Sequence, residues 1–389
     1  MHMMDWKISN EGFPVLRVAL VGYGLAGRVI HGPLLNSTSG MKVTAVVCSN
    51  SNRREQARHD FPDASLAFEA AEIWSAADDF ELVVVASPSA AHFGHVKEGL
   101  RRGLHVVVDK PIAGNASEAL QITQIANSFS RQVHSFHTRR WDSDFLTLKA
   151  ILDRTELGNV RSLESRYESI TGPSRTPWRD SPNLQDLGGV LLDLSSHLVD
   201  QAMHLLGPVV VVSAQLRSVR DPASAEDDAR LTLTHLTGAR SHLIASRASS
   251  TTGPRFRALC EGGEVHVHFT DSQEKALRRG EVPGDVGWGV ESSSQLATFR
   301  PYGQDQSTLE LIRPKRGRWD VFYQAVRNSI LTGGKAPVPL ADVIETMRVL
   351  DAARLSSARG EPVDVRHQPE HRESHPPIID DSANSPSSK

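Results

Sequence analysis

The stretch VLRVALVGYGLAGRVIHGPLL, from Val15 to Leu35, decides the fold of this chain. It begins with an almost continuously apolar run, which is typical of a strand that is buried on both faces. The glycines Gly22, Gly24 and Gly27 follow directly, and a helix-like segment follows them. In such a strand, G-x-G-x-x-G turn and helix, the glycines let the backbone approach a pyrophosphate at the helix N-terminus. The stretch therefore predicts a domain that binds a dinucleotide.

The same alternation of strands and helices continues to about residue 137. Strand-like runs follow at 42–48, 81–89, 105–111 and 132–140, and helix-like segments lie between them at 53–60, 92–102 and 117–129. Because parallel strands need crossover helices, this order predicts a parallel sheet that is buried on both faces. We expect an α/β Rossmann domain over residues 15–137.

The rest of the chain has a different pattern. After a helix-like segment at 142–154, alternating or β-branched runs are separated by Gly, Pro, Asp and Ser turns. Such a series favours an α+β domain with an open, mainly antiparallel sheet, which we place at residues 138–366. Helical periodicity returns at 321–331 and 340–357. We treat residues 1–14 as an N-terminal extension and residues 367–389, which are rich in Pro, Ser and charge, as a flexible tail.

Length and composition narrow the functional classes. A chain of 389 residues is long enough for two domains with their own cores. Its net charge is -3, and Lys and Arg are scattered, so we expect no nucleic acid and no membrane surface as partner. The two cysteines exclude a disulfide framework, and we see no membrane span or secretion signal. We expect a soluble, cytoplasmic protein.

The end of the second strand bears on which dinucleotide fits. An acid there would hydrogen-bond the adenosine ribose and repel a 2′-phosphate, but the sequence reads CSNSNRRE. Ser49, Asn50 and Ser51 offer small polar groups. Arg53 and Arg54 offer positive charge that can pair with a phosphate dianion, unless both are simply solvated at a helix start. We expect NADP as the cofactor, with NAD left open.

Two further segments carry residues that suit proton handling. The motif DKP places Lys110 at the carboxyl end of a parallel strand, where doubly wound folds bind ligands. In DLGGVLLDLSSHLVDQ, Asp193 and His197 are four residues apart, so a helix places them on one face. The imidazole can accept the proton that an alcohol loses together with its hydride, and Asp193 can orient the imidazole or bind the substrate. Lys110 can hydrogen-bond the reacting oxygen. These residues predict an oxidoreductase that acts on a secondary alcohol.

The motifs GYGLAG, DKP and GG-x-x-x-D-x-x-x-H-x-x-D together resemble the Gfo/Idh/MocA oxidoreductase family, over roughly residues 15–359. HGPLL, HVVVDKP and FHTRRWDSDFLTLK resemble the branch of NADP-dependent scyllo-inositol dehydrogenases. The resemblance implies interconversion of scyllo-inositol and its 2-keto inosose, with Lys110, Asp193 and His197 as the catalytic trio. Asp109 stands where many relatives have Glu, and Ser196 where many have Gly.

The resemblance also implies further residues around the cleft. Ser87, Pro88 and His92 would line the cofactor cleft, Trp178 and Arg179 would reach its nicotinamide end, and Arg140 and Trp141 would lie near it. The whole set expected at the cofactor is Gly22, Gly24, Leu25, Ala26, Gly27, Ser49, Asn50, Ser51, Arg53, Arg54, Ser87, Pro88, His92, Lys110, Trp178 and Arg179. The set expected at the substrate is Lys110, Arg140, Trp141, Asp193 and His197.

Two other readings stay open at this point. The substrate can be an aldose or a keto-sugar rather than a cyclitol, since the sequence does not separate them. A protein of this architecture can also be a dinucleotide-binding sensor or repressor without turnover, although the presence of Lys110, Asp193 and His197 argues against that class. We expect no metal site. We expect a homodimer or homotetramer that forms through the second domain, because an open sheet with one uncovered face would leave apolar surface to bury.

Overall fold

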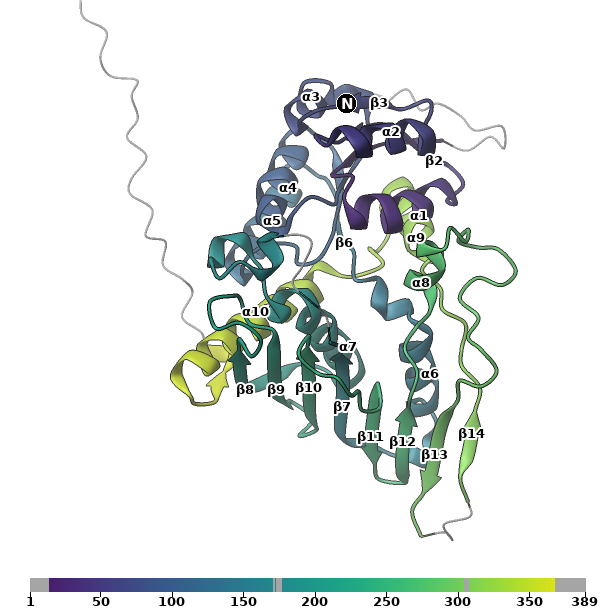
Figure 1. The fold of residues 1–389 in the computed structure, drawn as a ribbon, viewed down its shortest axis with the longest axis vertical. Helices are drawn as coiled ribbons and strands as arrows, with labels where there is room; N and C mark the ends of the chain where they lie inside the picture. Colours follow the sequence, from purple (N-terminus) through teal and green to yellow (C-terminus); the bar gives the residue numbers. More distant parts are fainter. Residues whose placement is uncertain (1–13, 171, 173–176, 304–307, 368–389) are drawn as a thin grey trace, which may run out of the picture.

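The computed structural model describes residues 14–170, 172, 177–303 and 308–367. The expected N-terminal extension and C-terminal tail lie outside the described residues, apart from Pro14 and His367. Two layered units follow each other along the chain, each built on one sheet (Figure 1). The expected fold class, a Rossmann unit followed by an α+β unit with an open sheet, is confirmed.

The first unit is a parallel sheet of six strands in the order β3-β2-β1-β4-β5-β6. Its central strands are apolar on both faces, and every residue of β4 is buried, because helices cover the sheet on either side. The strands are β1 (Leu16–Val21), β2 (Met41–Val47), β3 (Ser65–Ala67), β4 (Leu82–Val85), β5 (His105–Val108) and β6 (Val133–Ser135).

The predicted helices of this unit are present and begin within two residues of the expected positions, while α3 (Ala70–Ser75) was not predicted. The helix after the glycine turn opens as a π-helical segment, η1 (Ala26–His31), before it continues as α1 (Gly32–Asn36). The amide of Arg53 donates to the side chain of Asn50, which caps the next helix. The remaining helices are α2 (Ser51–Asp60), α4 (His92–Arg101) and α5 (Ala116–Ser128).

The second unit is a nine-stranded sheet in the order β14-β13-β12-β11-β7-β10-β9-β8-β15. All neighbouring pairs are antiparallel except β7 and β10, which run parallel at the centre. The strands are β7 (Val160–Glu168), β8 (Val209–Arg217), β9 (Asp228–His235), β10 (Arg240–Ser246), β11 (Phe256–Cys260), β12 (Gly263–Val267), β13 (Ala297–Pro301), β14 (Glu310–Ile312) and β15 (Val363–Asp364).

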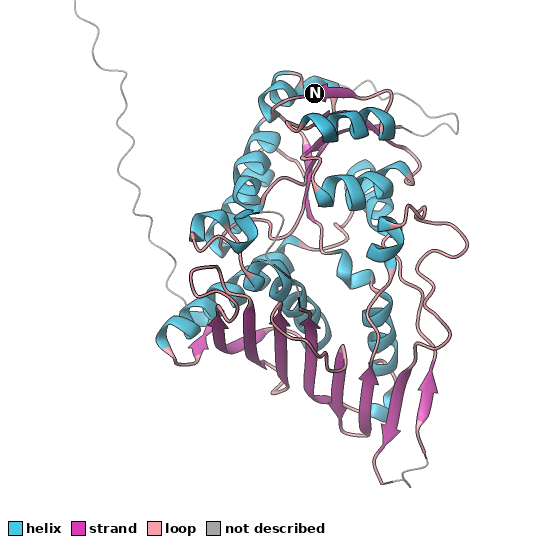
Figure 2. Ribbon diagram, viewed as in Figure 1, coloured by secondary structure: helices cyan, strands magenta, loops and turns pink. Residues whose placement is uncertain are grey.

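Helices cover one face of this sheet and leave the other uncovered (Figures 1 and 2). The covering helices are α6 (Ser143–Leu152), α7 (Ser196–Leu206) and α10 (Leu340–Arg359), while α8 (Gln273–Arg278) and α9 (Val321–Thr332) reach the first unit. Our expectation that the uncovered face is apolar is wrong over β7, β11 and β12, where Glu164, Arg257 and Glu264 form ion pairs across the strands.

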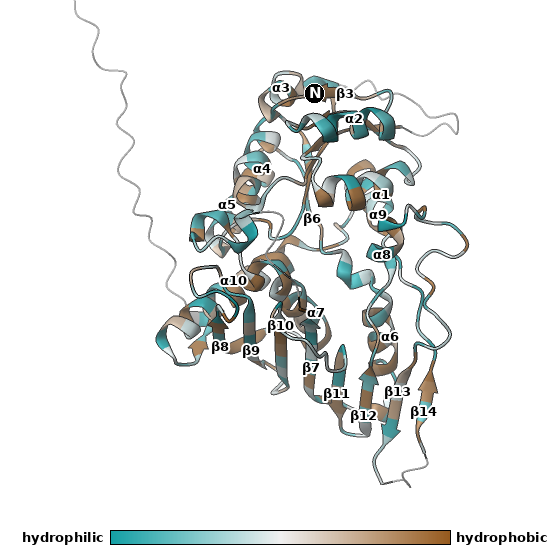
Figure 3. Ribbon diagram, in the orientation of Figure 1, coloured by the Kyte–Doolittle hydropathy of each residue, from teal (hydrophilic) through white to brown (hydrophobic). Residues whose placement is uncertain are grey.

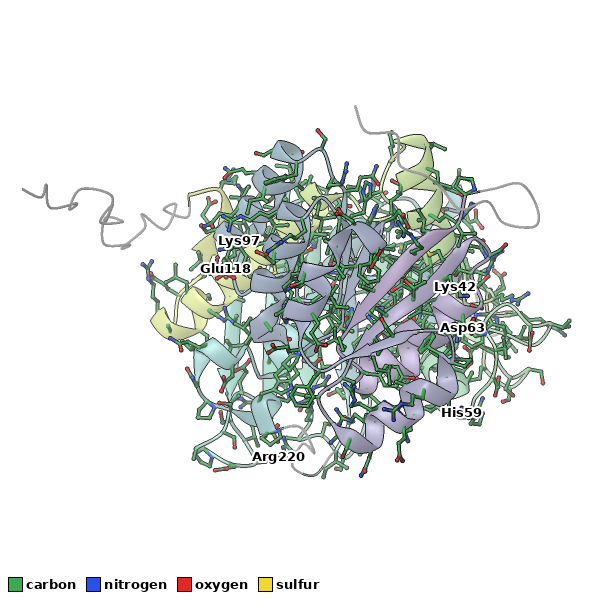
Figure 4. All side chains as sticks on the ribbon, turned by 90° about the horizontal axis from the view of Figure 1, so that it is seen from above. Lys42, His59, Asp63, Lys97, Glu118 and Arg220 are labelled. Carbon is green, nitrogen blue, oxygen red and sulfur yellow. The ribbon has the colours of Figure 1, made fainter. Side chains whose placement is uncertain are left out.

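Hydropathy follows this layering. Hydrophobic residues, brown in Figure 3, concentrate on the strands of the first sheet and on the helix faces that pack against the sheets. Charged side chains of both signs surround the molecule in Figure 4, where Lys42 lies beside Asp63, its ion-pair partner at 3.0 Å. Among the described residues, none of the helices combines the length and the apolar character that crossing a membrane requires.

Candidate active site

The glycine turn after β1 shows why each glycine is needed. Gly22 has a φ of +100°, and a Cβ there would lie 2.6 Å from the carbonyl oxygen of Ala86. A Cβ on Gly27 would lie 2.0 Å from the carbonyl oxygen of Gly22. A Cβ on Gly24 would meet nothing nearer than Arg53 Nη1 at 3.9 Å. The first and third glycines therefore serve the tight turn and its packing. The second leaves space for a ligand to come close to the protein backbone.

A cleft of about 420 Å³ runs from this turn to the carboxyl end of β5. Its walls include most of the expected residues, namely Gly22, Gly24, Leu25, Ala26, Ser49, Asn50, Arg53, Ser87, Pro88, His92, Lys110, Trp178, Arg179 and Asp193. The walls also include Tyr23, Phe68, His95 and Asp109, which sequence reasoning did not single out. The glycine turn at one end of the cleft and the strand ends along its wall fit a dinucleotide.

Arg53 and Arg54 have different environments, although they are adjacent. Arg54 donates to the carbonyl oxygens of Cys48, Leu66 and Ala67 at 2.8 to 3.1 Å, so it joins the end of β2 to β3. Arg53 lies on the cleft wall beside Gly24. The expected phosphate role therefore falls to Arg53 alone, and the role we gave Arg54 is corrected to a structural one. Ser51, the first residue of α2, is also absent from the cleft wall.

His92 holds together the two loops that flank the cleft. Its Nδ1 lies 2.7 Å from the carbonyl oxygen of Pro111, and its Nε2 lies 2.9 Å from that of Ser87. The ring is 1% exposed, and this burial lowers the pKa of His92. His92 therefore shapes the cleft by fixing its backbone.

Lys110 and Asp193 meet at the far end of the cleft. Lys110 Nζ donates to Asp193 Oδ1 at 2.8 Å and also to the Asp193 carbonyl oxygen. The other carboxylate oxygen pairs with Arg247, which follows β10, and lies 3.6 Å from Arg179 Nη1. Burial alone would raise the pKa of Asp193, but the charges of Lys110, Arg179 and Arg247 hold it well below its usual range. Asp193 is thus an ionised carboxylate surrounded by three cations.

This arrangement revises the expected role of Asp193 and adds a residue. We expected Asp193 to orient His197 or to bind the substrate, and its carboxylate instead contacts Lys110, Arg247 and Arg179. Sequence reasoning missed Arg247, because it lies in no motif and meets Asp193 only where β10 packs beside the π-helical segment η8 (Leu191–Ser195) in the fold. The available signal was weak: an arginine directly after a strand, in ASRASS.

His197 lies at the start of α7, directly after the π-helical segment η8, and is not part of the cleft wall. It is 7% exposed, and within the described part of the chain its Nδ1 is buried without a hydrogen-bond partner. Burial lowers the pKa of His197 well below its ordinary value, and the charges of Lys110 and Arg139 lower it further. The imidazole is therefore neutral near pH 7 and able to accept a proton.

Arg140 and Trp141 do not line the cleft. Both belong to the short helix η4 (Thr138–Trp141). Arg140 donates to Asp200 at 2.6 and 2.9 Å and to Asp342 at 3.0 Å, and it borders a separate cavity between α7 and α10. The Trp141 ring packs edge-on against Phe322. Our placement of these two side chains at the substrate is corrected, because the buried ion pair with Asp200 fixes Arg140 elsewhere.

Comparisons with known proteins agree with this geometry. Residues 16–137 match the NAD-binding Rossmann fold of the Gfo/Idh/MocA oxidoreductase family, and residues 149–365 match its C-terminal alpha/beta domain. The chain is 31% identical to a Bacillus subtilis protein named scyllo-inositol 2-dehydrogenase (NADP(+)) IolW, over 90% of this chain and 96% of that one. It is 26% identical to an inositol 2-dehydrogenase of Streptomyces avermitilis, over 76% of this chain and 95% of that one.

A solved structure gives the same result for the fold. The structure of yvaA from Bacillus subtilis superposes on this chain with a TM-score of 0.82 at 29% identity, and the match covers 90% of this chain and all of the other. The similarity of fold therefore extends over both units of the chain.

Proposed function

Because this chain belongs to the Gfo/Idh/MocA family of oxidoreductases, we propose that it is an NADP-dependent dehydrogenase of a cyclitol, with scyllo-inositol and its 2-keto inosose as the substrate pair. One observation carries the proposal. The cleft that begins at the glycine turn ends at Lys110, and the ion pair of Lys110 with Asp193 is followed one helical turn later by the neutral base His197.

Three residues of the chain have separate roles in the proposed reaction. A bound nicotinamide cofactor supplies the acceptor or donor of the hydride. In the oxidation, the carbinol C–H bond breaks as hydride leaves, the hydroxyl proton passes to His197, and the C=O bond forms. Lys110 donates a hydrogen bond to the reacting oxygen and stabilises its alkoxide character. Asp193 holds the Lys110 ammonium in place, and the reduction reverses each step.

The preference for NADP rests on the residues after β2. No carboxylate follows β2 in the segment 48–54, and Arg53 lies on the cleft wall near Gly24. A guanidinium there can bind a 2′-phosphate dianion through charge-assisted hydrogen bonds. The B. subtilis relative that is named as NADP-dependent supports the same choice.

The first experiment measures initial rates of NADP⁺ and NAD⁺ reduction with purified protein and a panel of inositol stereoisomers, aldoses and open-chain polyols. Preference for NADP⁺ with scyllo-inositol supports the proposal. Activity confined to a sugar retains the mechanism and replaces the substrate. Tight cofactor binding without turnover on any compound contradicts the proposal and moves the protein to the sensor class.

We also propose that the uncovered sheet face joins two copies of this chain, as a homodimer or as part of a homotetramer. The support is the alternation of charge across the strands, where Glu164 and Glu264 flank Arg257, since a two-fold axis can set such acids against bases of the partner. Sedimentation velocity over a concentration series tests this. A constant monomer mass contradicts it, and Arg257→Glu should weaken the association.

A further inference from the structure

His31 is a buried titratable group that the proposed mechanism does not use. It lies at the end of η1, and its ring is fully buried. The ring packs on Phe136 of the first unit, with 4.1 Å between centroids. Its Nδ1 lies 2.7 Å from the hydroxyl oxygen of Tyr323, which comes from α9 nearly 300 residues later and is also fully buried. Two distant segments therefore meet at this ring.

The other ring nitrogen faces the active site. His31 Nε2 is buried, and no residue that the structure describes accepts or donates a hydrogen bond to it. It lies 3.9 Å from Asp109 Oδ2. The second oxygen of the same carboxylate, Asp109 Oδ1, accepts the backbone N–H of Lys110 at 2.8 Å. Asp109 also lines the cleft, so its carboxylate stands between His31 and the reacting end.

The tyrosine decides which nitrogen of His31 carries the proton. A neutral imidazole has one donor and one acceptor nitrogen. If Tyr323 donates to Nδ1, the proton of His31 lies on Nε2 and is directed at the Asp109 carboxylate. The other tautomer would direct a lone pair at a carboxylate, which is repulsive. Burial and then the charge of Asp109 raise the pKa of Tyr323, so its hydroxyl keeps its proton and can donate.

The charges around Asp109 agree with this direction. Burial alone would raise the pKa of Asp109, but the N–H that the neutral His31 ring directs at the carboxylate, followed by the charge of Lys110, lowers it to about 2. The carboxylate is therefore ionised and attracts an N–H donor. The 3.9 Å separation is about 1 Å longer than an N–H···O bond. Hydrogen bonds of an active site are often long without ligand and shorten in the complex.

We propose that His31 and Tyr323 are positioning residues that hold the Asp109 carboxylate, and through it the backbone of Lys110, during hydride transfer. The inference rests on the proposed dehydrogenase function for its effect on rate. The chain Tyr323 to His31 to Asp109 thus connects α9 to the loop that presents Lys110.

The first test needs no substrate. Nitrogen-15 NMR of the full chain labelled in histidine reports the tautomer of each imidazole, and the His31 signals are identified by their loss in His31→Gln. We expect the Nε2–H tautomer in the unmodified protein and a mixture of tautomers in Tyr323→Phe, which keeps the ring and removes only the hydroxyl. An Nδ1–H tautomer in the unmodified protein, or no change in Tyr323→Phe, overturns the proposal.

The second test uses turnover. We expect Tyr323→Phe to lower kcat about tenfold with little change in the KM of NADP⁺, and to have no further effect in an Asp109→Asn background, because residues that act through one another are not additive. Equal losses in both backgrounds overturn the proposal. Tyr167→Phe is the matched control, since it removes a partly buried hydroxyl that donates to Asp142 at 3.2 Å. If no substrate is found, the proposed function fails and the NMR result alone decides this inference.

Discussion

The two ends of the cofactor cleft are built in opposite ways. At the reacting end, the side chains of Lys110 and Asp193 are 12% and 19% exposed, and their charges are bound to each other and to Arg247. At the nucleotide end, Ser49, Asn50 and Arg53 are exposed and lie at the start of a helix. Buried, mutually fixed charges are preorganised for a transition state, whereas exposed donors are screened by water. Changes at the first end should affect kcat, and changes at the second should affect cofactor affinity.

The largest effect should come from His197→Ala. Removal of the proton acceptor should lower kcat for alcohol oxidation by roughly 10²- to 10⁴-fold. The dissociation constant of NADP⁺, measured by fluorescence titration, should not change, because His197 is not part of the cleft wall. His204→Ala, on the same helix, is the control and should retain activity. Near-normal turnover of His197→Ala would assign the proton role to Lys110.

The pH dependence of kcat sharpens the same point. Burial, followed by the charges of Lys110 and Arg139, lowers the pKa of His197 well below the ordinary 6.5. A base with a lowered pKa stays neutral, and so able to accept a proton, in more acidic solution. The rate of oxidation should therefore stay level as the pH falls through 6.5 and decline only below it. A decline that begins above pH 7 in the kcat profile would contradict this assignment.

Arg247→Gln should have the next largest effect on kcat. It removes one of the three cations around Asp193 and leaves the Lys110 ammonium with a less fixed partner. We expect kcat to fall about tenfold, the size of one charge-assisted hydrogen bond. Arg240→Gln, at the exposed opposite end of β10, serves as the control. Equal activity of the two variants in steady-state assays would remove Arg247 from the reacting end.

At the nucleotide end, Arg53→Ala should raise the KM of NADP⁺ by roughly 10- to 100-fold and leave that of NAD⁺ nearly unchanged, because only NADP⁺ carries the 2′-phosphate. Arg54→Ala is a matched comparison on the next residue. It removes three bonds to carbonyl oxygens and should affect both cofactors alike. A parallel loss for both cofactors in Arg53→Ala would contradict a phosphate role.

The smallest effect should come from the ion pair of Lys42 with Asp63 at the edge of the first sheet (Figure 4). Both side chains are more than half exposed, so water and salt screen the attraction. Lys42→Ala should change the free energy of unfolding by less than about 1 kcal/mol. Urea denaturation measures this free energy. A larger loss of stability would contradict the view that water screens the exposed charges of this protein.

Much of the fold could be predicted from the sequence, because its signals are local. Apolar runs, the spacing of Gly22, Gly24 and Gly27, and the change from 3.6- to 2-residue periodicity each depend on a few neighbouring residues. Lys110 was predictable for the same reason, since it follows a buried strand. The parallel pairing of β7 with β10 was not, because no local pattern specifies which distant strand becomes a neighbour.

The motifs predicted that Lys110, Asp193 and His197 belong to the site but not which of them meet, since the Asp193 carboxylate contacts Lys110 and Arg247 rather than His197. Arg247 joins Asp193 across 54 residues, and His31 meets Tyr323 across 292, so neither contact leaves a signal in sequence spacing. Arg53 and Arg54 show a second limit. Their side chains are chemically equal, and only the position of three carbonyl oxygens decides that Arg54 is structural.

The central position of β7 has a consequence for synthesis on the ribosome. Its neighbours β10 and β11 lie more than 70 residues further along the chain. The middle of the second sheet therefore cannot close until about residue 260 has emerged, and long-range pairing of this kind is slow. The first unit also gains some of its contacts late, since Arg327 of α9 donates hydrogen bonds to the carbonyl oxygens of Pro14 and Gly40. The segments that flank β1 are thus anchored by one of the last helices to be translated. The surface that α9 covers therefore has to be protected from other contacts for most of the elongation of the nascent chain.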